Sequence, residues 1–273
     1  MSINELYKIF LQHPSVETDT RKIKEGDIFF ALKGANFNGN KYAKDALEKG
    51  AAYCICDEIS DAKSDRVIFV DDVQDTLQQL ARKHREQFNI PFIGITGSNG
   101  KTTTKELVHA VLSTRYKCYT TQGNLNNHIG VPLTLLSIKK DAEIAVIEMG
   151  ANHLYEIESY CKYAMPTHGL ITNVGKAHLE GFGSAENIKK AKGELFDYLR
   201  ANEGTAFINN DYDYLKEIAA GIKNIITYGT EDADYTGSVK NDSTYLEVEI
   251  TAGAKIGTVK TQLAGNYNLS NVL

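Results

Sequence analysis

The sequence predicts an α/β protein in which a small N-terminal α/β domain precedes a larger domain with a mainly parallel sheet. Three observations support this fold class. The length of 273 residues suggests two domains, because an average domain has about 150 residues. Short apolar runs alternate with amphipathic stretches from Pro91 onward, which is typical of right-handed βαβ units. Near the C-terminus, apolar and charged residues alternate strictly, which indicates an antiparallel hairpin solvated on one face.

Residues 1–82 are predicted to form the small domain. Ser2 and Glu5 have the spacing of a capping box, so a helix is expected to begin after Ser2. Strands are expected at the apolar runs 27–33, 52–56 and 67–70. A loop rich in glycine and asparagine, followed by a helix, separates the first two strands. A helix over 73–88 then leads out of this block, and we place the domain boundary after residue 82.

Residues 83–273 are predicted to form the larger domain. Its strands are expected over 92–96, 117–121, 143–148, 168–174, 205–209 and 225–228. Its main helices are expected over 101–114, 154–163 and 184–199, with another helix between the last two strands. The hairpin is expected over 245–251 and 259–263. The final residues, from Ser270 to Leu273, have the pattern of the first turn of a helix.

The composition excludes several functional classes. Thirty basic and 35 acidic residues give a net charge of −5, which argues against a general nucleic-acid binder. No apolar run approaches the roughly 18–20 residues of a membrane span. The N-terminus has no secretory signal pattern. The four cysteines form neither a redox nor a convincing zinc motif, so we expect reduced, mostly buried thiols in a cytoplasmic protein.

The segment from Gly94 to Thr102 reads GITGSNGKT and joins a predicted strand to a predicted helix, which is the context of a phosphate loop. Backbone N–H groups of such a loop and the helix N-terminus bind an anion. Lys101 would reach the β- and γ-phosphates of ATP, and the Thr102 hydroxyl would bind Mg²⁺. The loop is a shortened variant, because Ile95 stands where the full pattern has glycine. The residues expected to bind nucleotide are Thr96, Gly97, Ser98, Asn99, Gly100, Lys101, Thr102 and Thr103.

A glycine-rich turn with an incidental lysine is the alternative interpretation of this loop. The phosphate loop is favoured, since Gly-Lys-Thr at a strand-to-helix junction is rarely incidental. The larger domain is therefore predicted to be a P-loop ATPase domain.

Two further residues are candidate magnesium ligands. Glu148 ends one predicted strand, and His178 lies just after another. The carboxyl ends of parallel strands meet at one edge of a sheet, beside the phosphate loop. Taken singly, an exposed strand-end glutamate and a loop histidine would be the simpler interpretations. Together with Thr102, they favour a metal site.

Six stretches resemble one family, the ATP-dependent Mur ligases of peptidoglycan assembly. They are TRKIKEGDIFFALKGANFNGNKY, GITGSNGKTTTKE, TQGNLNNHIGVPLTLL, VIEMGANHLYEIE, ITNVGKAHLEGFGS and AKGELF, in the family's order from Thr20 to Phe196. The EMGAN stretch and Lys105-Glu106 are similar to members that add D-alanyl-D-alanine to UDP-N-acetylmuramoyl-tripeptide. The resemblance implies amide-bond formation through an acyl phosphate, with ATP and Mg²⁺, in a cytoplasmic protein that we expect to be monomeric.

The resemblance also implies residue roles. The catalytic set would be Lys101, Glu148, His178 and Lys192, of which Lys192 matches a lysine that is carbamylated in the family. Residues 1–82 would hold the UDP end of the substrate, and an Arg/Lys pair beside a glycine-containing loop also suits a pyrophosphate on chemical grounds. The substrate-binding candidates are Thr20, Arg21, Lys22, Lys33, Gly34, Asn126, Asn127 and Asn152. Asn268 and Asn271 match asparagines placed near adenine.

The sequence departs from the family in two ways. Tyr267 stands where the family commonly has histidine, and the family's third domain has no counterpart, which raises the alternative of an incomplete ATP-binding domain. We therefore expect binding with poor turnover. One alternative is another Mur-type or folylpolyglutamate synthetase-like ligase, although the uridine-site match argues against the folate type. The other is a non-catalytic nucleotide-binding module, against which the intact residues of the predicted site argue.

Overall fold

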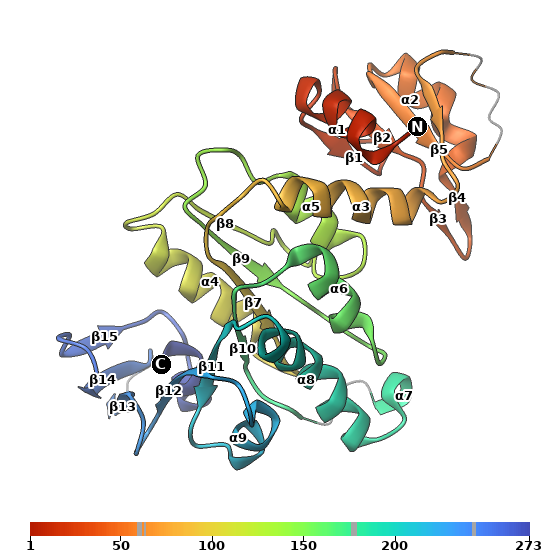
Figure 1. The fold of residues 1–273 in the computed structure, drawn as a ribbon. Helices are drawn as coiled ribbons and strands as arrows, with labels where there is room; N and C mark the ends of the chain where they lie inside the picture. Colours follow the sequence, from red (N-terminus) through yellow and green to blue (C-terminus); the bar gives the residue numbers. More distant parts are fainter. Residues whose placement is uncertain (59–61, 63, 176–178, 242–243) are drawn as a thin grey trace. The chain divides into compact units, whose positions relative to one another are not determined.

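The computed structural model describes residues 1–58, 62, 64–175, 179–241 and 244–273, which form two compact units (Figure 1). The first unit comprises Met1–Asn89 and His128–Lys140, and the second comprises Ile90–Asn127 and Asp141–Leu273. The predicted boundary after residue 82 falls inside the helix α3 (Val73–Arg85), which lies wholly in the first unit. The chain therefore passes between the units three times.

The first unit contains a four-stranded parallel sheet. Its strand order is β1 (Val16–Glu17), β2 (Ile28–Phe30), β5 (Tyr53–Cys56) and β6 (Val67–Phe69). The other elements of this unit are α1 (Ile3–Gln12), the hairpin β3 (Lys33–Gly34) and β4 (Phe37–Asn38), η1 (Gly39–Tyr42), α2 (Ala43–Glu48), α3 and α5 (Gly130–Leu136). The predicted capping box is confirmed, since Ser2 N donates to the Glu5 carboxylate at 2.7 Å while Ser2 Oγ accepts from Glu5 N.

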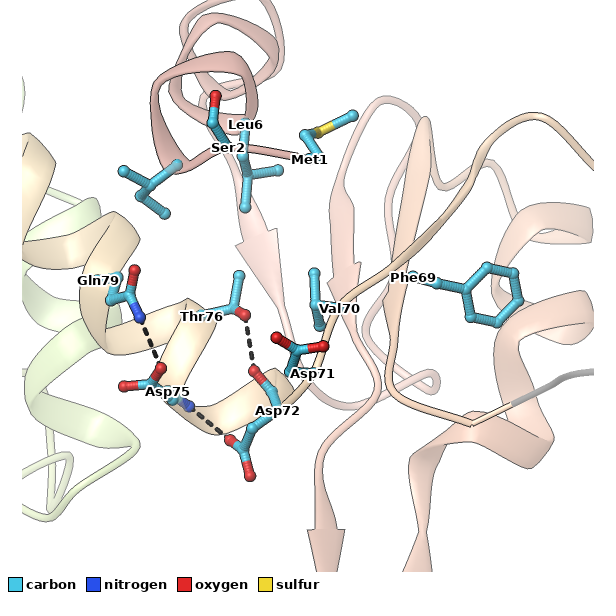
Figure 2. Close-up of a pocket in the computed structure, with 11 residues that line it drawn as sticks. Met1, Ser2, Leu6, Phe69, Val70, Asp71, Asp72, Asp75, Thr76 and Gln79 are labelled. Carbon is cyan, nitrogen blue, oxygen red and sulfur yellow. Dashed lines mark hydrogen bonds between the residues drawn. The ribbon is translucent and has the colours of Figure 1, made fainter.

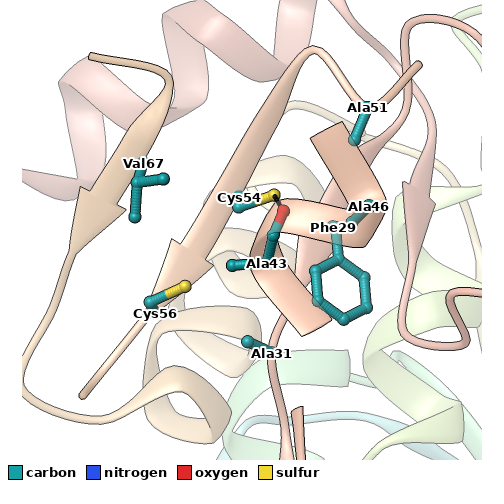
Figure 3. Packing of buried hydrophobic residues seen from close by; sticks show 8 residues of the cluster. All are labelled: Phe29, Ala31, Ala43, Ala46, Ala51, Cys54, Cys56 and Val67. Atoms are coloured by element: carbon teal, nitrogen blue, oxygen red, sulfur yellow. Dashed lines mark hydrogen bonds between the residues drawn. The ribbon is translucent and has the colours of Figure 1, made fainter. Parts of the chain in front are cut away.

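Small side chains fill part of the core of this unit (Figure 3). The cluster consists of Phe29, Ala31, Ala43, Ala46, Ala51, Cys54, Cys56 and Val67. The alanines let α2 approach the sheet closely, and Cys54 Sγ donates a hydrogen bond to the Ala43 carbonyl at 3.4 Å. Burial raises the pKa of Cys54 to about 12 and that of Cys56 to about 11, so both remain thiols at neutral pH. This confirms the expectation of buried free thiols for these two residues.

His84 links three helices of the first unit. Its Nε2 donates to the Ile138 carbonyl just after α5 at 2.8 Å, and its Nδ1 accepts from the Tyr7 hydroxyl of α1 at 3.1 Å, in the tautomer that satisfies both contacts. Burial lowers the pKa of His84, which favours the neutral ring that this arrangement needs. α5 itself was not predicted, because Pro132 falls in its first turn, where proline is tolerated but gives no helical signal.

A cavity of about 210 Å³ lies in the first unit (Figure 2). It is lined from α1, the end of β6 and the start of α3. Asp72, one of its residues, caps α3 by accepting from Asp75 N at 2.7 Å. None of the predicted functional residues lines this cavity, so it does not coincide with the predicted site.

The second unit is built on a nine-stranded sheet. In spatial order the strands are β15 (Thr258–Lys260), β14 (Glu247–Ala252), β13 (Tyr235–Asn241), β12 (Asn224–Gly229), β11 (Thr205–Asn209), β10 (His168–Ile171), β7 (Phe92–Thr96), β9 (Ile144–Glu148) and β8 (Cys118–Thr120). Neighbours from β8 through β13 are parallel, and the pairs that involve β14 are antiparallel. The hairpin of β14 and β15 confirms the prediction. β13 was not predicted, because its sequence YTGSVKN lacks clear alternation.

Helices cover both faces of this sheet (Figure 1). α4 (Lys101–Leu112) packs on β7, β8 and β9, and α8 (Ala185–Ala201) packs on β7, β10 and β11 from the other face, with α6 (Glu156–Ala164) beside it. Ile93 and Ile95 cluster with Val108 of α4, whereas a Cβ on Gly94 would lie 3.1 Å from Leu195 of α8. Alternate residues of β7 thus face different helices.

Four short helical segments complete the unit, namely α7 (Leu179–Phe182), α9 (Asp213–Ala219), η2 (Asn266–Asn268) and α10 (Leu269–Val272). α10 confirms the helical turn expected at the end of the sequence. Within the described part of the chain, every helix is too short or too polar to cross a membrane.

Candidate functional site

The predicted phosphate loop joins β7 to α4. Gly97 has φ 145° and Gly100 has φ 78°, conformations that favour glycine. A Cβ on Gly97 would collide with Thr172 Oγ1, so the loop fits against its neighbour only with glycine at this position. Lys101 folds back over the loop, and its Nζ donates to the carbonyls of Gly97 at 2.8 Å and Ser98 at 3.2 Å. The ammonium group therefore lies over the loop that would hold an anion.

The segment after β10 fixes the shape of this loop. Thr172 Oγ1 donates to the Asn99 carbonyl at 2.6 Å. Asn173 Oδ1 accepts from Asn99 N and its Nδ2 donates to the Asn99 carbonyl, both at 3.0 Å. Ser98 N donates to the Asn173 carbonyl at 2.9 Å. Sequence reasoning missed Thr172 and Asn173, although two polar residues directly after a buried strand were a usable signal.

Glu148 is a buried carboxylate at the centre of a polar cluster. It ends β9 and is 1% exposed, so the interpretation as an exposed strand-end residue is wrong. Its Oε1 accepts from Thr102 Oγ1 at 3.1 Å and from Asn126 Nδ2 at 2.7 Å. Its Oε2 is buried, and no group among the residues that the structure describes forms a hydrogen bond with it. Because a buried carboxylate oxygen is normally paired, this oxygen is a candidate ligand for a cation.

Lys192 is a buried amine and Lys101 a half-buried one, and their charges interact. Burial lowers the pKa of Lys101, and the charge of Glu148 opposes that shift. Lys192 is 2% exposed, and its Nζ donates to the Ala151 carbonyl at 3.1 Å. Burial, with the charge of Lys101 adding to it, lowers the pKa of Lys192 to about 8. Lys189, on the same helix, instead pairs with Glu217 at 2.7 Å, so Lys192 differs from a lysine on a solvated face.

Glu194 organises the start of α6. Its Oε1 accepts from Tyr155 N at 2.6 Å and its Oε2 accepts from Glu158 N at 3.0 Å, which satisfies N–H groups of the first turn. The predicted substrate residue Asn152 lies in the exposed turn before this helix, where its N–H donates to Glu156 at 2.6 Å. Sequence reasoning missed Glu194, because its role depends on the packing of α8 against α6.

The structure brings the C-terminal asparagines to the phosphate loop. Asn271 Oδ1 accepts from Thr104 Oγ1 at 3.2 Å, and a Cβ on Gly100 would lie 2.5 Å from it. Asn271 Nδ2 donates to Asn268 Oδ1 at 2.8 Å. Asn271 and Thr104 also line an apolar cavity of about 560 Å³. Tyr267, at the position where histidine was expected, is 81% exposed.

The remaining candidates are less closely grouped. In the first unit, Arg21 pairs with both carboxylate oxygens of Asp19, at 2.8 and 2.7 Å. Lys33 of β3 pairs with Asp57 at 3.1 Å and Glu58 at 3.3 Å. An anionic substrate would have to compete with these carboxylates. The other candidates of this unit are Thr20, Lys22 and Gly34, which lie at or near its surface.

Two candidates lie outside these groups. Asn127 is exposed at the end of the loop that carries Asn126. His178 lies outside the described residues. Among the residues that the structure describes, no three histidine, cysteine, aspartate or glutamate side chains gather as a metal cluster. The part of the predicted metal set that is described therefore consists of Thr102 and Glu148.

Comparison with known families agrees with this geometry. The family model described as "Mur ligase middle domain" matches residues 95–273. The model described as "Mur ligase family, catalytic domain" matches residues 14–85. The first match covers the phosphate loop, Glu148, Lys192 and the C-terminal asparagines.

Individual relatives carry more specific names. UDP-N-acetylmuramoyl-tripeptide–D-alanyl-D-alanine ligase of Bacillus subtilis (strain 168) is 40% identical over 220 residues, which cover 77% of this chain and 48% of the relative. A MurF crystal structure from Acinetobacter baumannii has a TM-score of 0.85 at 33% identity and covers 94% of this chain and 57% of that one. MurF of Thermotoga maritima, in complex with ADP, has a TM-score of 0.84 at 33% identity and covers 96% of this chain and 61% of that one.

The chain spans about half the length of the curated relatives that it matches. The family models nevertheless cover most of its residues, including every described residue of the nucleotide site. The chain therefore belongs to the Mur ligase family.

Proposed function

We propose that this chain is the UDP-substrate- and ATP-binding part of a ligase that joins D-alanyl-D-alanine to UDP-N-acetylmuramoyl-tripeptide in peptidoglycan precursor synthesis. The observation that carries the proposal is the buried Glu148, which has one unpaired oxygen and is bonded to Thr102 beside Lys101. Relatives with this activity in their names support the choice of substrates. The first unit would hold the UDP end, through Thr20, Arg21, Lys22, Lys33 and Gly34.

The residues of the site fit ATP and Mg²⁺. The unpaired Glu148 Oε2 and the Thr102 hydroxyl are the oxygen ligands that Mg²⁺ prefers, and His178 would complete the protein's set. The loop from Thr96 to Thr103 would hold the phosphates, with Asn268 and Asn271 beside it. When bound, ATP supplies the phosphoryl group and Mg²⁺ compensates its charge.

The residues of the site would each have a task in acyl phosphate formation. Lys101 would exchange its bonds to loop carbonyls for bonds to phosphate oxygens, which offsets their charge as the substrate carboxylate attacks. Asn126, in the loop after β8, donates a hydrogen bond to Glu148. Together with Asn127 and Asn152, it would orient the tripeptide. The amine of D-alanyl-D-alanine then displaces phosphate from the acyl group. We expect this chain by itself to bind its nucleotide and substrate but to turn them over slowly.

Calorimetry and phosphate release test the proposal together. The purified chain is expected to bind ATP far more tightly with Mg²⁺ than without it, because the Glu148 carboxylate repels an uncompensated triphosphate. Phosphate release is expected only with UDP-N-acetylmuramoyl-tripeptide, and to rise when D-alanyl-D-alanine is added. Binding without any release would favour a non-catalytic nucleotide module. Absence of Mg²⁺-dependent ATP binding would overturn the proposal.

Lys192 is proposed to be carbamylated. Its neutral amine attacks CO₂ at carbon and loses a proton, which gives a carbamate that could help to place a cation. An ordinary lysine is almost fully protonated at neutral pH, but a pKa of about 8 leaves roughly a tenth of the amine neutral at pH 7 and half at pH 8. Burial thus prepares this lysine, and not its neighbours on α8, for the reaction.

The pH dependence of ¹³C-NMR spectra measures this modification. With dissolved ¹³CO₂ held constant, the carbamate signal is expected to rise with pH between about 7 and 9, since the neutral amine reacts and its pKa is lowered. The signal is expected to vanish in Lys192→Met and to persist in Lys190→Met, which changes an exposed lysine of the same helix. A midpoint above pH 10, or no carbamate in the unmodified chain, would contradict the assignment.

A further inference from the structure

A second lysine of α4 is completely buried. Lys105 is 0% exposed, and its Nζ donates to the Thr121 carbonyl at 2.7 Å. The same ammonium pairs with Glu106, whose side chain is 58% exposed, at 2.8 Å. A buried ammonium is more costly to desolvate than an apolar side chain of similar length. Packing alone therefore does not account for a lysine at this position.

Thr121 connects Lys105 to the candidate metal ligand. Thr121 is fully buried just after β8, and its Oγ1 accepts from the N–H of Glu148 at 3.0 Å. Its own N–H donates to the Val146 carbonyl of β9 at 3.1 Å. Lys105 is thus bonded to the backbone of Thr121, and the side chain of Thr121 is bonded to the backbone of Glu148.

The helix α4 consequently reaches Glu148 by two routes. Thr102 bonds directly to the carboxylate, and Lys105, three residues later and so on the same helix face, acts through Thr121. Two attachments from one helix fix both ends of the Glu148 residue, its backbone and its carboxylate. The sheet pairs Glu148 with Ile95 of β7, and the link through Thr121 adds a restraint on the Glu148 backbone from the side of β8.

We propose that Lys105 is a positioning residue that holds Glu148 in register with Thr102 and thereby sets the affinity of the nucleotide site for Mg²⁺. This inference rests on the proposed function. Lys105 itself touches neither the metal nor the nucleotide. Removal of a group that orients a metal-binding carboxylate typically weakens metal binding about 10–100-fold, while contacts elsewhere in the site stay in place.

The test is a Mg²⁺ titration of ATP binding by calorimetry, with nucleotide binding in the presence of EDTA as a second readout. Lys105→Met is expected to raise the Mg²⁺ concentration for half-maximal binding by about tenfold. ADP affinity in EDTA is expected to change less than about twofold, because the loop and Lys101 are intact. Lys162→Met, which changes an exposed lysine of α6, is the control and is expected to match the unmodified chain.

A second pair of variants tests the same link without touching the lysine. Thr121→Val removes the oxygen that accepts from Glu148 N, and Thr121→Ser retains it. The valine variant is expected to show the raised Mg²⁺ requirement and the serine variant to behave normally. If Lys105→Met does not give a cooperative thermal transition, the Thr121 pair decides the question.

Three outcomes would overturn the inference. One is a folded Lys105→Met with an unchanged Mg²⁺ requirement, and another is an equal loss of ADP affinity in EDTA, which would indicate a general loosening of the loop. The third is a Thr121→Val variant that behaves like Thr121→Ser. Failure of the unmodified chain to bind ATP with Mg²⁺ would instead overturn the proposed function, and the inference with it.

Discussion

Lys101→Met is expected to lower ATP affinity by about 100-fold while the fold is retained. The lysine would make charge-assisted hydrogen bonds to phosphate, and the loss of roughly 3 kcal/mol corresponds to two orders of magnitude in affinity. Stability is expected to change little, because burial lowers the pKa of Lys101 and so disfavours its charge in the folded state without nucleotide. Methionine keeps the length of the side chain without the ammonium. Calorimetry with Mg²⁺-ATP measures the affinity.

The matched control is Lys190→Met, which changes an exposed lysine of α8 and is expected to bind ATP normally. Thermal unfolding, followed by circular dichroism, separates loss of binding from loss of structure. If Lys101→Met bound ATP as tightly as the unmodified chain, the phosphate-loop assignment would be wrong. If it unfolded many degrees earlier, the lysine would have a mainly structural role.

Gly97→Ala is expected both to destabilise the second unit and to abolish nucleotide binding. The φ of 145° at this position strains any other residue by about 1–3 kcal/mol. The new Cβ would also collide with Thr172 Oγ1 and displace the hydroxyl that donates to Asn99. With a combined loss of roughly 3 kcal/mol, the melting temperature is expected to fall by roughly 6–12 °C. Calorimetric scanning measures the shift.

Gly175→Ala is the control for a new methyl group beside the same loop. A Cβ there would lie 3.4 Å from Asn99 Nδ2, an ordinary contact, and the residue needs no left-handed conformation. Its melting temperature is expected to stay within about 2 °C of the unmodified chain. An equal fall in both alanine variants would show that any added bulk disturbs the loop, and would contradict the specific role of Gly97.

Local patterns were sufficient to predict much of the fold. β7, α4 and β11 begin where the apolar periodicity and the glycine positions indicate, since short-range sterics and burial determine them. α5 and β13 were missed, because a proline in a first turn and a polar strand at a parallel–antiparallel junction depend on tertiary partners. The predicted end of the first unit, residue 82, also differs from the observed one, because no local pattern shows that α5 belongs to this unit.

The candidate site divides in the same way. The sequence placed Glu148 at a sheet edge, but only the structure shows its burial and its unpaired oxygen. Residue spacing could not separate Lys192 from Lys189, because the face of α8 that is buried depends on α6 and the sheet. Lys105 had no chemical signal beyond the family resemblance. Its importance follows from contacts with Thr121, a residue of another strand end.

The return of α5 to the first unit has a consequence for synthesis on the ribosome. Domains generally fold as their chain emerges, starting from the N-terminus. Here, His84 meets its acceptor only when Ile138 has emerged, after β7, α4 and β8 of the second unit. The nascent first unit therefore remains incomplete, with one side of α3 uncovered, while the phosphate loop is already outside the exit tunnel. The crossover between β8 and β9, which contains α5, can close only after Ile138 has emerged.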